Sequence, residues 1–142
     1  MNANGQLLEA LNHYPFTLLH GDYRAENLAY MESPIIIDWQ QAAWSLMTID
    51  LAWFAQSTSG METDQLNAYY RNCLEIHLNH QLDDRDWQAM LLLGYAFNAL
   101  RAIGFYAFFY RTDEDLESKS SDERVVKQQG QHVVDALRWL EQ

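Results

Sequence analysis

Apolar residues recur every three or four positions through most of the chain after position 47, a spacing typical of amphipathic helices. This pattern predicts helices over 6–11, 48–56, 63–80, 87–110 and 121–140. Thr48 and Thr63 stand where they can cap their helices, and Ser120 with Glu123 has the spacing of a capping box. The segment 112–121 is acidic and polar, which predicts a linker before the last helix.

The part before position 47 shows a different pattern. Two short apolar runs, 28–30 and 35–38, flank Glu32-Ser33-Pro34 and predict a β-hairpin. The isoleucines at 35–37 are typical of a buried strand, which would fix the position of Asp38 at its end. We therefore predict a mainly α fold with a small β-hairpin.

The stretch 87–110 is apolar on nearly every side and is long enough to span a membrane. Asn98 and Arg101 lie near its middle, and acidic residues rather than basic ones follow it at 113–115. These features favour a central helix wrapped by the others, with no membrane span. Arg101 then needs a partner in the core, because an unpaired buried charge is strongly destabilising. We expect a carboxylate or helix carbonyls.

The residues with the clearest chemistry lie between His20 and Asp38. Asp22 is followed five positions later by Asn27, and Asp38 comes at the end of the isoleucine run. In phosphoryl transfer an Asp accepts the proton of the attacking hydroxyl, and an Asn and a second Asp bind Mg²⁺, which prefers oxygen ligands. Arg24 stands two residues after the first Asp, where its planar guanidinium can contact a phosphoryl group.

The motifs HGDYRAENL, IIIDWQ and TIDLAWF, in this order, resemble the C-terminal lobe of the aminoglycoside phosphotransferase and choline kinase superfamily. Their spelling is similar to its ecdysteroid-kinase-like branch of small-molecule kinases. The resemblance implies phosphorylation of a small-molecule hydroxyl by ATP or GTP, with Asp22 as the base and Asn27 and Asp38 on Mg²⁺. It also implies that Asp50 braces the loop backbone, and His20 is expected to support the same loop.

Two features of the motifs remain open. Arg24-Ala25-Glu26 and Trp44-Ser45 depart from the commonest spellings of the family, and the second departure leaves the turn before Asp50 undefined. Asp50 also lies in the first turn of a predicted helix, where a carboxylate is favourable for the helix dipole alone.

The length of 142 residues predicts a single domain, with the loop, hairpin and bracing helix in 20–54 and a helical part in 62–142. Only nineteen residues precede His20, and the six glycines are scattered. A nucleotide-binding sheet lobe with a Gly-rich loop needs more than this. We therefore expect a kinase-like C-terminal lobe whose N-terminal lobe is absent.

Composition limits the other possibilities. The net charge of −11 argues against nucleic acid as a partner, and is compatible with a cationic substrate or with solubility alone. A single cysteine and a polar, uncharged N-terminus without an apolar core predict a cytoplasmic protein. Two functions remain. One is a phosphotransferase lobe completed by another polypeptide, and the other is an inactive truncated module that binds partners or forms a homodimer.

Overall fold

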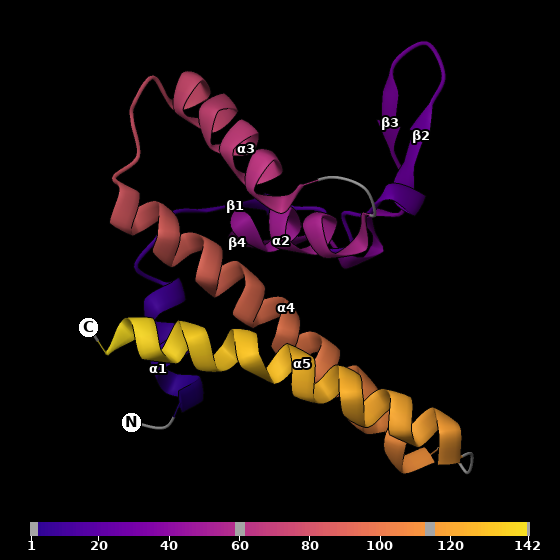
Figure 1. Ribbon diagram of the computed structural model, residues 1–142. Coiled ribbons are helices and arrows are strands. Elements are labelled where there is room, and N and C mark those ends of the chain that lie inside the picture. The colour runs from indigo at the N-terminus through magenta and orange to yellow at the C-terminus, as the bar shows by residue number, and fades with distance from the viewer. Residues whose placement is uncertain (1–2, 59–61, 113–115, 142) are drawn as a thin grey trace.

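The computed structural model describes residues 3–58, 62–112 and 116–141 (Figure 1). Its helices are α1 (Ala3–Leu11), α2 (Thr48–Ser57), α3 (Thr63–Leu78), α4 (Asp84–Thr112) and α5 (Leu116–Leu140). Two short 3-10 turns, η1 (Ala25–Asn27) and η2 (Trp39–Gln41), lie beside the predicted loop and hairpin. The prediction of a mainly α fold with a small β-hairpin is confirmed.

The strands form two antiparallel pairs. β2 (Leu28–Tyr30) and β3 (Pro34–Ile36) make the predicted hairpin, which projects away from the helices (Figure 1). β1 (Phe16–Leu19) pairs with β4 (Ala43–Leu46), a strand that the hydrophobic pattern did not indicate. This pair holds the two ends of the segment 20–42 together, so the loop and the hairpin emerge from one place.

The core forms around the first half of α4. The side chains of Trp87, Met90 and Leu93 are almost fully buried there, and α4 packs against both α2 and α5. α2 crosses closely at Gly94, where an added Cβ would lie 2.5 Å from the carbonyl oxygen of Thr48. A glycine at this crossing therefore lets the two backbones approach.

Two polar side chains fix the same crossing. Thr48 donates from its hydroxyl to the carbonyl of Met90, and Asn98 Nδ2 donates to the carbonyl of Ile49 over 2.7 Å. Both side chains are fully buried, where a hydrogen-bonded polar group specifies one arrangement. The prediction that Thr48 caps α2 was wrong, because its hydroxyl bonds to α4 instead.

The second half of α4 leaves the core. Leu100, Phe105 and Phe108 are 38, 59 and 64 % exposed, and this half runs beside the start of α5 as an extended helical pair (Figure 1). The helix is long and apolar enough to cross a membrane by length and composition over Asp84–Phe108, with a mean hydropathy of 1.3 and 33 % of the window buried. The expectation that other helices wrap the whole stretch holds for its first half alone.

Three boundaries differ from prediction. No side chain caps α3, so Thr63 is its first residue without the expected bond. Helix α5 begins at Leu116, which places Ser120 and Glu123 inside the helix rather than in a capping box. The expected linker over 112–121 is thus helical at both ends, because its Glu and Lys residues are good helix formers. Residues 113–115 lie outside the described residues.

The isoleucine run is not a buried strand. Ile35, Ile36 and Ile37 are 39, 37 and 47 % exposed, since β3 pairs with β2 alone among the described strands. The apolar run predicted the strand correctly, but the prediction that the strand is buried was wrong.

Candidate active site

The loop after β1 begins with a sharp backbone turn at Gly21, which has a φ of +83°. The Gln41 backbone lies directly against this glycine, and an added Cβ would lie 2.1 Å from the Gln41 carbonyl oxygen. A side chain would thus be excluded both by the dihedral angle and by the contact. The loop therefore contacts η2, the 3-10 turn that follows the hairpin, at Gln41.

Asp50 in the first turn of α2 holds the same part of the loop. Its carboxylate accepts from the backbone N–H of His20 over 2.6 Å and from that of Gly21 over 2.9 Å. Charged acceptors form the stronger class of hydrogen bonds. Asp50 therefore occupies a favourable place for the helix dipole and also makes two bonds to the loop backbone, so the two interpretations of this residue are compatible.

Asp22 is buried, and each of its carboxylate oxygens has a partner. Trp53 Nε1 donates to Oδ1 over 2.8 Å, and Asn27 Nδ2 donates to Oδ2 over 3.0 Å. Arg24 Nε lies 3.3 Å from Oδ2. Asn27 Nδ2 also donates to the Asp22 carbonyl over 2.8 Å, which ties the two residues through both side chain and backbone. The carboxylate is thus oriented before any ligand arrives.

The segment that leads to Asp38 is fastened to the loop. The backbone N–H of Ile37 donates to the Asn27 carbonyl over 3.0 Å, and the Ile37 carbonyl lies 2.8 Å from His20 Nε2. His20 Nδ1 accepts from the Asp22 backbone N–H over 3.3 Å, so these partners assign the proton to Nε2, which donates to Ile37. His20 therefore links the backbone on either side of the site.

Oxygen ligands for a metal are available in this arrangement. The Asn27 amide nitrogen faces Asp22, and no described residue donates to its Oδ1. Asp38 is exposed, adopts a left-handed φ of 65° and makes no capping bond with its side chain. An amide oxygen and a carboxylate are ligand types that Mg²⁺ takes from protein, with the rest coming from water and phosphate, and the Ile37–Asn27 hydrogen bond joins the two segments that carry them. Within the described residues no group of three or more His, Cys, Asp or Glu side chains is placed to hold a metal ion by itself.

Sequence reasoning missed Trp53 and the connection made by Arg101. Arg101 Nη1 donates to the Gly21 carbonyl over 2.8 Å and Nη2 to Gln41 Oε1 over 2.6 Å, while its guanidinium lies 5.6 Å from the centre of the Trp53 ring. The predicted carboxylate or helix carbonyl is therefore replaced by a loop carbonyl and an amide. Trp53 follows Asp50 by three positions, so helical spacing could have placed it on the loop-facing side.

An aromatic cavity of about 450 Å³ opens next to the loop. Tyr23 and Phe54 line it with their rings 5.3 Å apart, and Tyr69 and Tyr70 reach it from α3. Burial raises the pKa of Tyr70, and the charge of Asp50 adds to the effect. The phenol therefore stays protonated at neutral pH and can donate a hydrogen bond.

Comparison with known families decides the affiliation of this chain. The profile described as "Phosphotransferase enzyme family" matches residues 3–93, more than half of the 142 residues. The chain belongs to this family. Comparisons with curated proteins and with solved structures gave no match.

The match to the phosphotransferase family covers the elements that build the site. It spans β1, the loop, the hairpin and α2, and it ends at residue 93 within α4. Membership supports the prediction of a phosphotransferase-like function, and the family generally depends on ATP and a divalent metal. The ecdysteroid-kinase-like branch and the restriction to a C-terminal lobe stay predictions.

Proposed function

We propose that this chain is the catalytic portion of a small-molecule phosphotransferase that transfers phosphate from ATP or GTP to a hydroxyl group. The observation that supports this best is the environment of Asp22. Its carboxylate is held by Trp53, Asn27 and Arg24, on a loop whose backbone is fixed by Asp50. A preoriented carboxylate of this kind is what a general base requires.

Each residue then has a defined task. Asp22 accepts the proton as the hydroxyl oxygen bonds to the terminal phosphorus and the bond from that phosphorus to the bridging oxygen breaks. Asn27 Oδ1 and Asp38 hold Mg²⁺, which when bound neutralises charge on the phosphates. The Arg24 side chain is 43 % exposed, so its outer nitrogens can bind phosphoryl oxygens while Nε stays near Asp22.

We propose that the nucleotide is held between this site and a separate lobe. The lobe-facing surface, which we define as Leu18, Ile35, Ile37, Trp39 and Trp44, is apolar and exposed, from 39 % at Ile35 to 68 % at Trp44. Leu18 and Trp44 are direct partners across β1 and β4. Exposed apolar side chains on β1, β4 and the hairpin segment, near the proposed phosphate-transfer site, support the proposal that another polypeptide segment covers them.

The same surface favours a second candidate function, an inactive module that pairs with a copy of itself through the lobe-facing surface. Sedimentation of the chain at increasing concentration tests this alternative. A dimer that dissociates on Trp44→Ser would support it, and a monomer at high concentration would refute it. Lys127 and Glu123, which pair on the exposed face of α5, offer a control substitution away from this surface.

Metal binding tests the principal proposal without requiring a complete enzyme. Mg²⁺ and MgATP are titrated against the chain, with NMR signals of the loop as the readout, and Asp38→Asn should weaken metal binding by about tenfold or more. Asp86→Asn is the matched control, because Asp86 is exposed and lies in the first turn of α4, where its carboxylate accepts from the Tyr14 hydroxyl. Absence of binding at millimolar concentrations would refute metal-dependent chemistry by this chain alone.

Transfer itself is tested by adding a complementary lobe. Asp22→Ala should then abolish phosphorylation while leaving the fold intact, because the remaining loop contacts of Asp50 do not involve the Asp22 side chain. Persistent activity in that variant would show that another group acts as the base.

A further inference from the structure

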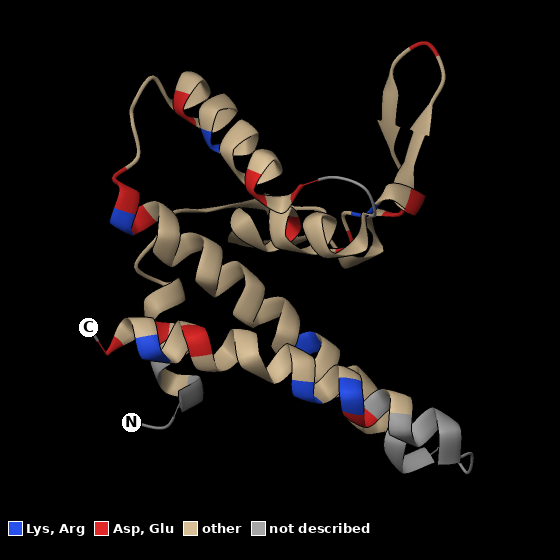
Figure 2. Ribbon diagram, viewed as in Figure 1, with Lys and Arg blue, Asp and Glu red and all other residues tan. Residues whose placement is uncertain are grey.

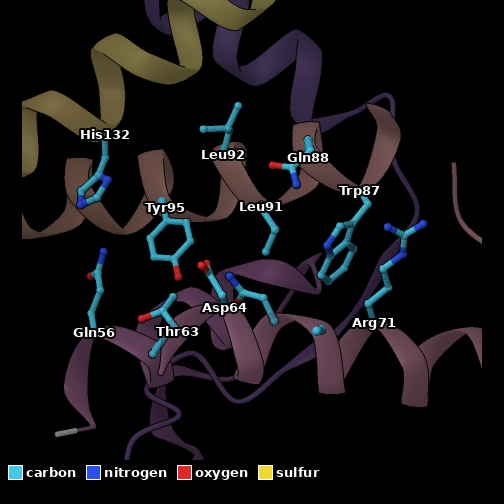
Figure 3. A pocket seen from close by; sticks show the side chains of 13 residues that line it. Gln56, Thr63, Asp64, Arg71, Trp87, Gln88, Leu91, Leu92, Tyr95 and His132 are labelled. Atoms are coloured by element: carbon cyan, nitrogen blue, oxygen red, sulfur yellow. The ribbon is translucent and has the colours of Figure 1, made fainter. Parts of the chain in front are cut away.

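Helix α4 carries no charged residue between Asp86 and Arg101 (Figure 2). The apolar residues of this stretch fall on two opposite faces, because positions three and four apart share one face of a helix. Trp87, Leu91 and Tyr95 point toward α3 (Figure 3). The opposite face borders α1 and carries Leu93, Ala96, Phe97 and Leu100. This second face is apolar throughout and ends at Arg101.

A groove of about 410 Å³ lies between this second face and α1. Leu7 and Leu11 of α1 are almost fully buried beneath it, whereas Leu8 of α1 and Leu100 of α4 are 59 and 38 % exposed. Every residue that lines the groove is apolar except Arg101. A ligand tail that covers the exposed leucines would remove apolar surface from water, which favours binding. The volume is in the range of pockets that hold small organic molecules.

Arg101 is a half-buried cation that forms no ion pair within the described residues. Its Nη1 donates to the Gly21 carbonyl over 2.8 Å and its Nη2 to Gln41 Oε1 over 2.6 Å, and both acceptors are neutral. A guanidinium has five N–H donors, so three remain beyond these two bonds. A carboxylate is the partner that this group would bind more strongly than either neutral acceptor.

A smaller cavity of about 220 Å³ shares Phe97 and Arg101 with the groove. Gly21, Gln41 and Ser45 also line this cavity, so polar groups of the loop, η2 and β4 lie beside the guanidinium. The groove is thus apolar along its length and polar and cationic where it meets the smaller cavity. This arrangement matches a molecule with a hydrocarbon tail and an anionic head.

We propose that the groove between α1 and α4 binds a free fatty acid of medium length, with its tail against Leu7, Leu11 and Phe97 and its carboxylate on Arg101. The two carboxylate oxygens match the planar guanidinium and supply the anionic partner that it lacks in the fold. The net charge of −11 favours cations over anions at the surface in general. Preference for an anion in this groove would therefore come from Arg101 itself.

Arg101 links the groove to the loop. The guanidinium that binds the carboxylate also holds the carbonyl of Gly21, which precedes Asp22. It lies 5.6 Å from the centre of the Trp53 ring, and the Trp53 indole donates to Asp22. A ligand on Arg101 therefore alters the surroundings of Asp22 without contacting it. That this makes the groove a regulatory site for phosphoryl transfer rests on the proposed function, whereas binding does not.

Binding is tested on the full chain, without nucleotide or metal, by NMR titration with octanoate, octan-1-ol and octylammonium below their micelle concentrations. The three probes share one tail and differ in the head group. We expect octanoate to shift the signals of Leu8, Leu100 and Arg101, and octan-1-ol to bind at least about tenfold more weakly. Octylammonium should bind least, whereas attraction by net charge alone would place it before octanoate. The Gly21 signal should shift with the same midpoint as the groove signals.

Variants locate the carboxylate and the tail. Arg101→Met should weaken octanoate binding at least about tenfold and leave octan-1-ol binding within about twofold, because the charged contact alone is removed. Leu8→Glu keeps the arginine and its loop contacts, and should weaken octanoate binding by roughly tenfold through a negative charge at the exposed edge of the groove. Ile76→Glu is the matched control, because Ile76 is 71 % exposed on α3 and does not line the groove. It should bind octanoate as the parent chain does.

The proposal is overturned if octan-1-ol binds as tightly as octanoate, if octylammonium binds more tightly, or if Arg101→Met leaves octanoate binding unchanged. Groove signals that shift with protein concentration alone would show that a second copy occupies the groove, and would equally overturn it. A Gly21 signal that does not respond would refute the link to the loop. None of these results depends on Mg²⁺ or phosphoryl transfer. Failure of octanoate binding would therefore leave the proposed function standing, and loss of metal binding would leave the groove standing.

Discussion

Replacing Asp50 with Asn separates a role in the loop from a role at the helix dipole. Asn keeps one accepting oxygen, but its NH₂ group would face one of the two backbone N–H groups, of His20 or Gly21. Losing a charge-assisted hydrogen bond costs about 1.5–3 kcal/mol, and leaving a buried donor unpaired costs about 1–3 kcal/mol. We expect the free energy of unfolding to fall by about 3–4 kcal/mol. Loss of a dipole interaction alone would cost only about 0.3–1 kcal/mol.

Urea unfolding measures the change, and hydrogen exchange at the Gly21 amide locates it. Asp64→Asn is the matched control, because Asp64 is also in the first turn of its helix but is exposed. The penalty for Asp50→Asn should persist in 1 M salt, which screens surface charges within about 3 Å. A loss below about 1 kcal/mol that disappears in salt would refute the loop role and leave the dipole interpretation.

Four other substitutions test packing, the loop contact and pH dependence. Gly94→Ala should lower the free energy of unfolding by about 3 kcal/mol, because the added Cβ would meet the Thr48 carbonyl. Gly104→Ala on the same helix has open space around the added Cβ and should raise the free energy of unfolding by up to about 1 kcal/mol. Urea unfolding of both variants checks the two values. Arg101→Met should cost about 1–2 kcal/mol and speed hydrogen exchange in the loop; unchanged exchange would contradict its contact there. The hydrogen bond from Arg71 lowers the pKa of Glu75, and the backbone N–H of Leu82 lowers it further. Ionised Glu75 therefore stabilises the fold above its unfolded pKa of 4.5, and this stabilisation is lost as the pH falls through the folded pKa. Unfolding across pH 7 to 3 should show a smaller slope in Glu75→Gln.

The fold was largely predictable because helical spacing and turn residues act locally. The hairpin and the helices appeared where periodicity placed them, with errors concentrated at their ends. Thr48 shows why the ends were harder, since its hydroxyl is used by α4, 42 positions away. Strand β4 was missed for a related reason, because its pairing with β1 is a contact between segments distant in sequence.

The site was predicted to the extent that its residues lie in short motifs. Asp22, Asn27 and the backbone before Asp38 are joined by hydrogen bonds, and Asp50 contacts the loop, although the roles of these residues in catalysis stay predictions. The hydrophobic pattern counts Trp53 as an apolar residue and says nothing of its indole N–H, so the pattern did not reveal the hydrogen bond to Asp22. Burial of the isoleucine run was also beyond the sequence, because it depends on what covers the hairpin.

The contact of Arg101 with Gly21 has a consequence for where this molecule can be divided. The segment that is recognisable as a phosphotransferase ends at residue 93, eight positions before the arginine that grips its own loop. Excising that segment would retain every motif and yet release the peptide group at Gly21 from one of its two anchors. The family match therefore ends before the part of the chain that holds the loop in place. A fragment cut at residue 93 would keep the family motifs but lose this contact with the loop.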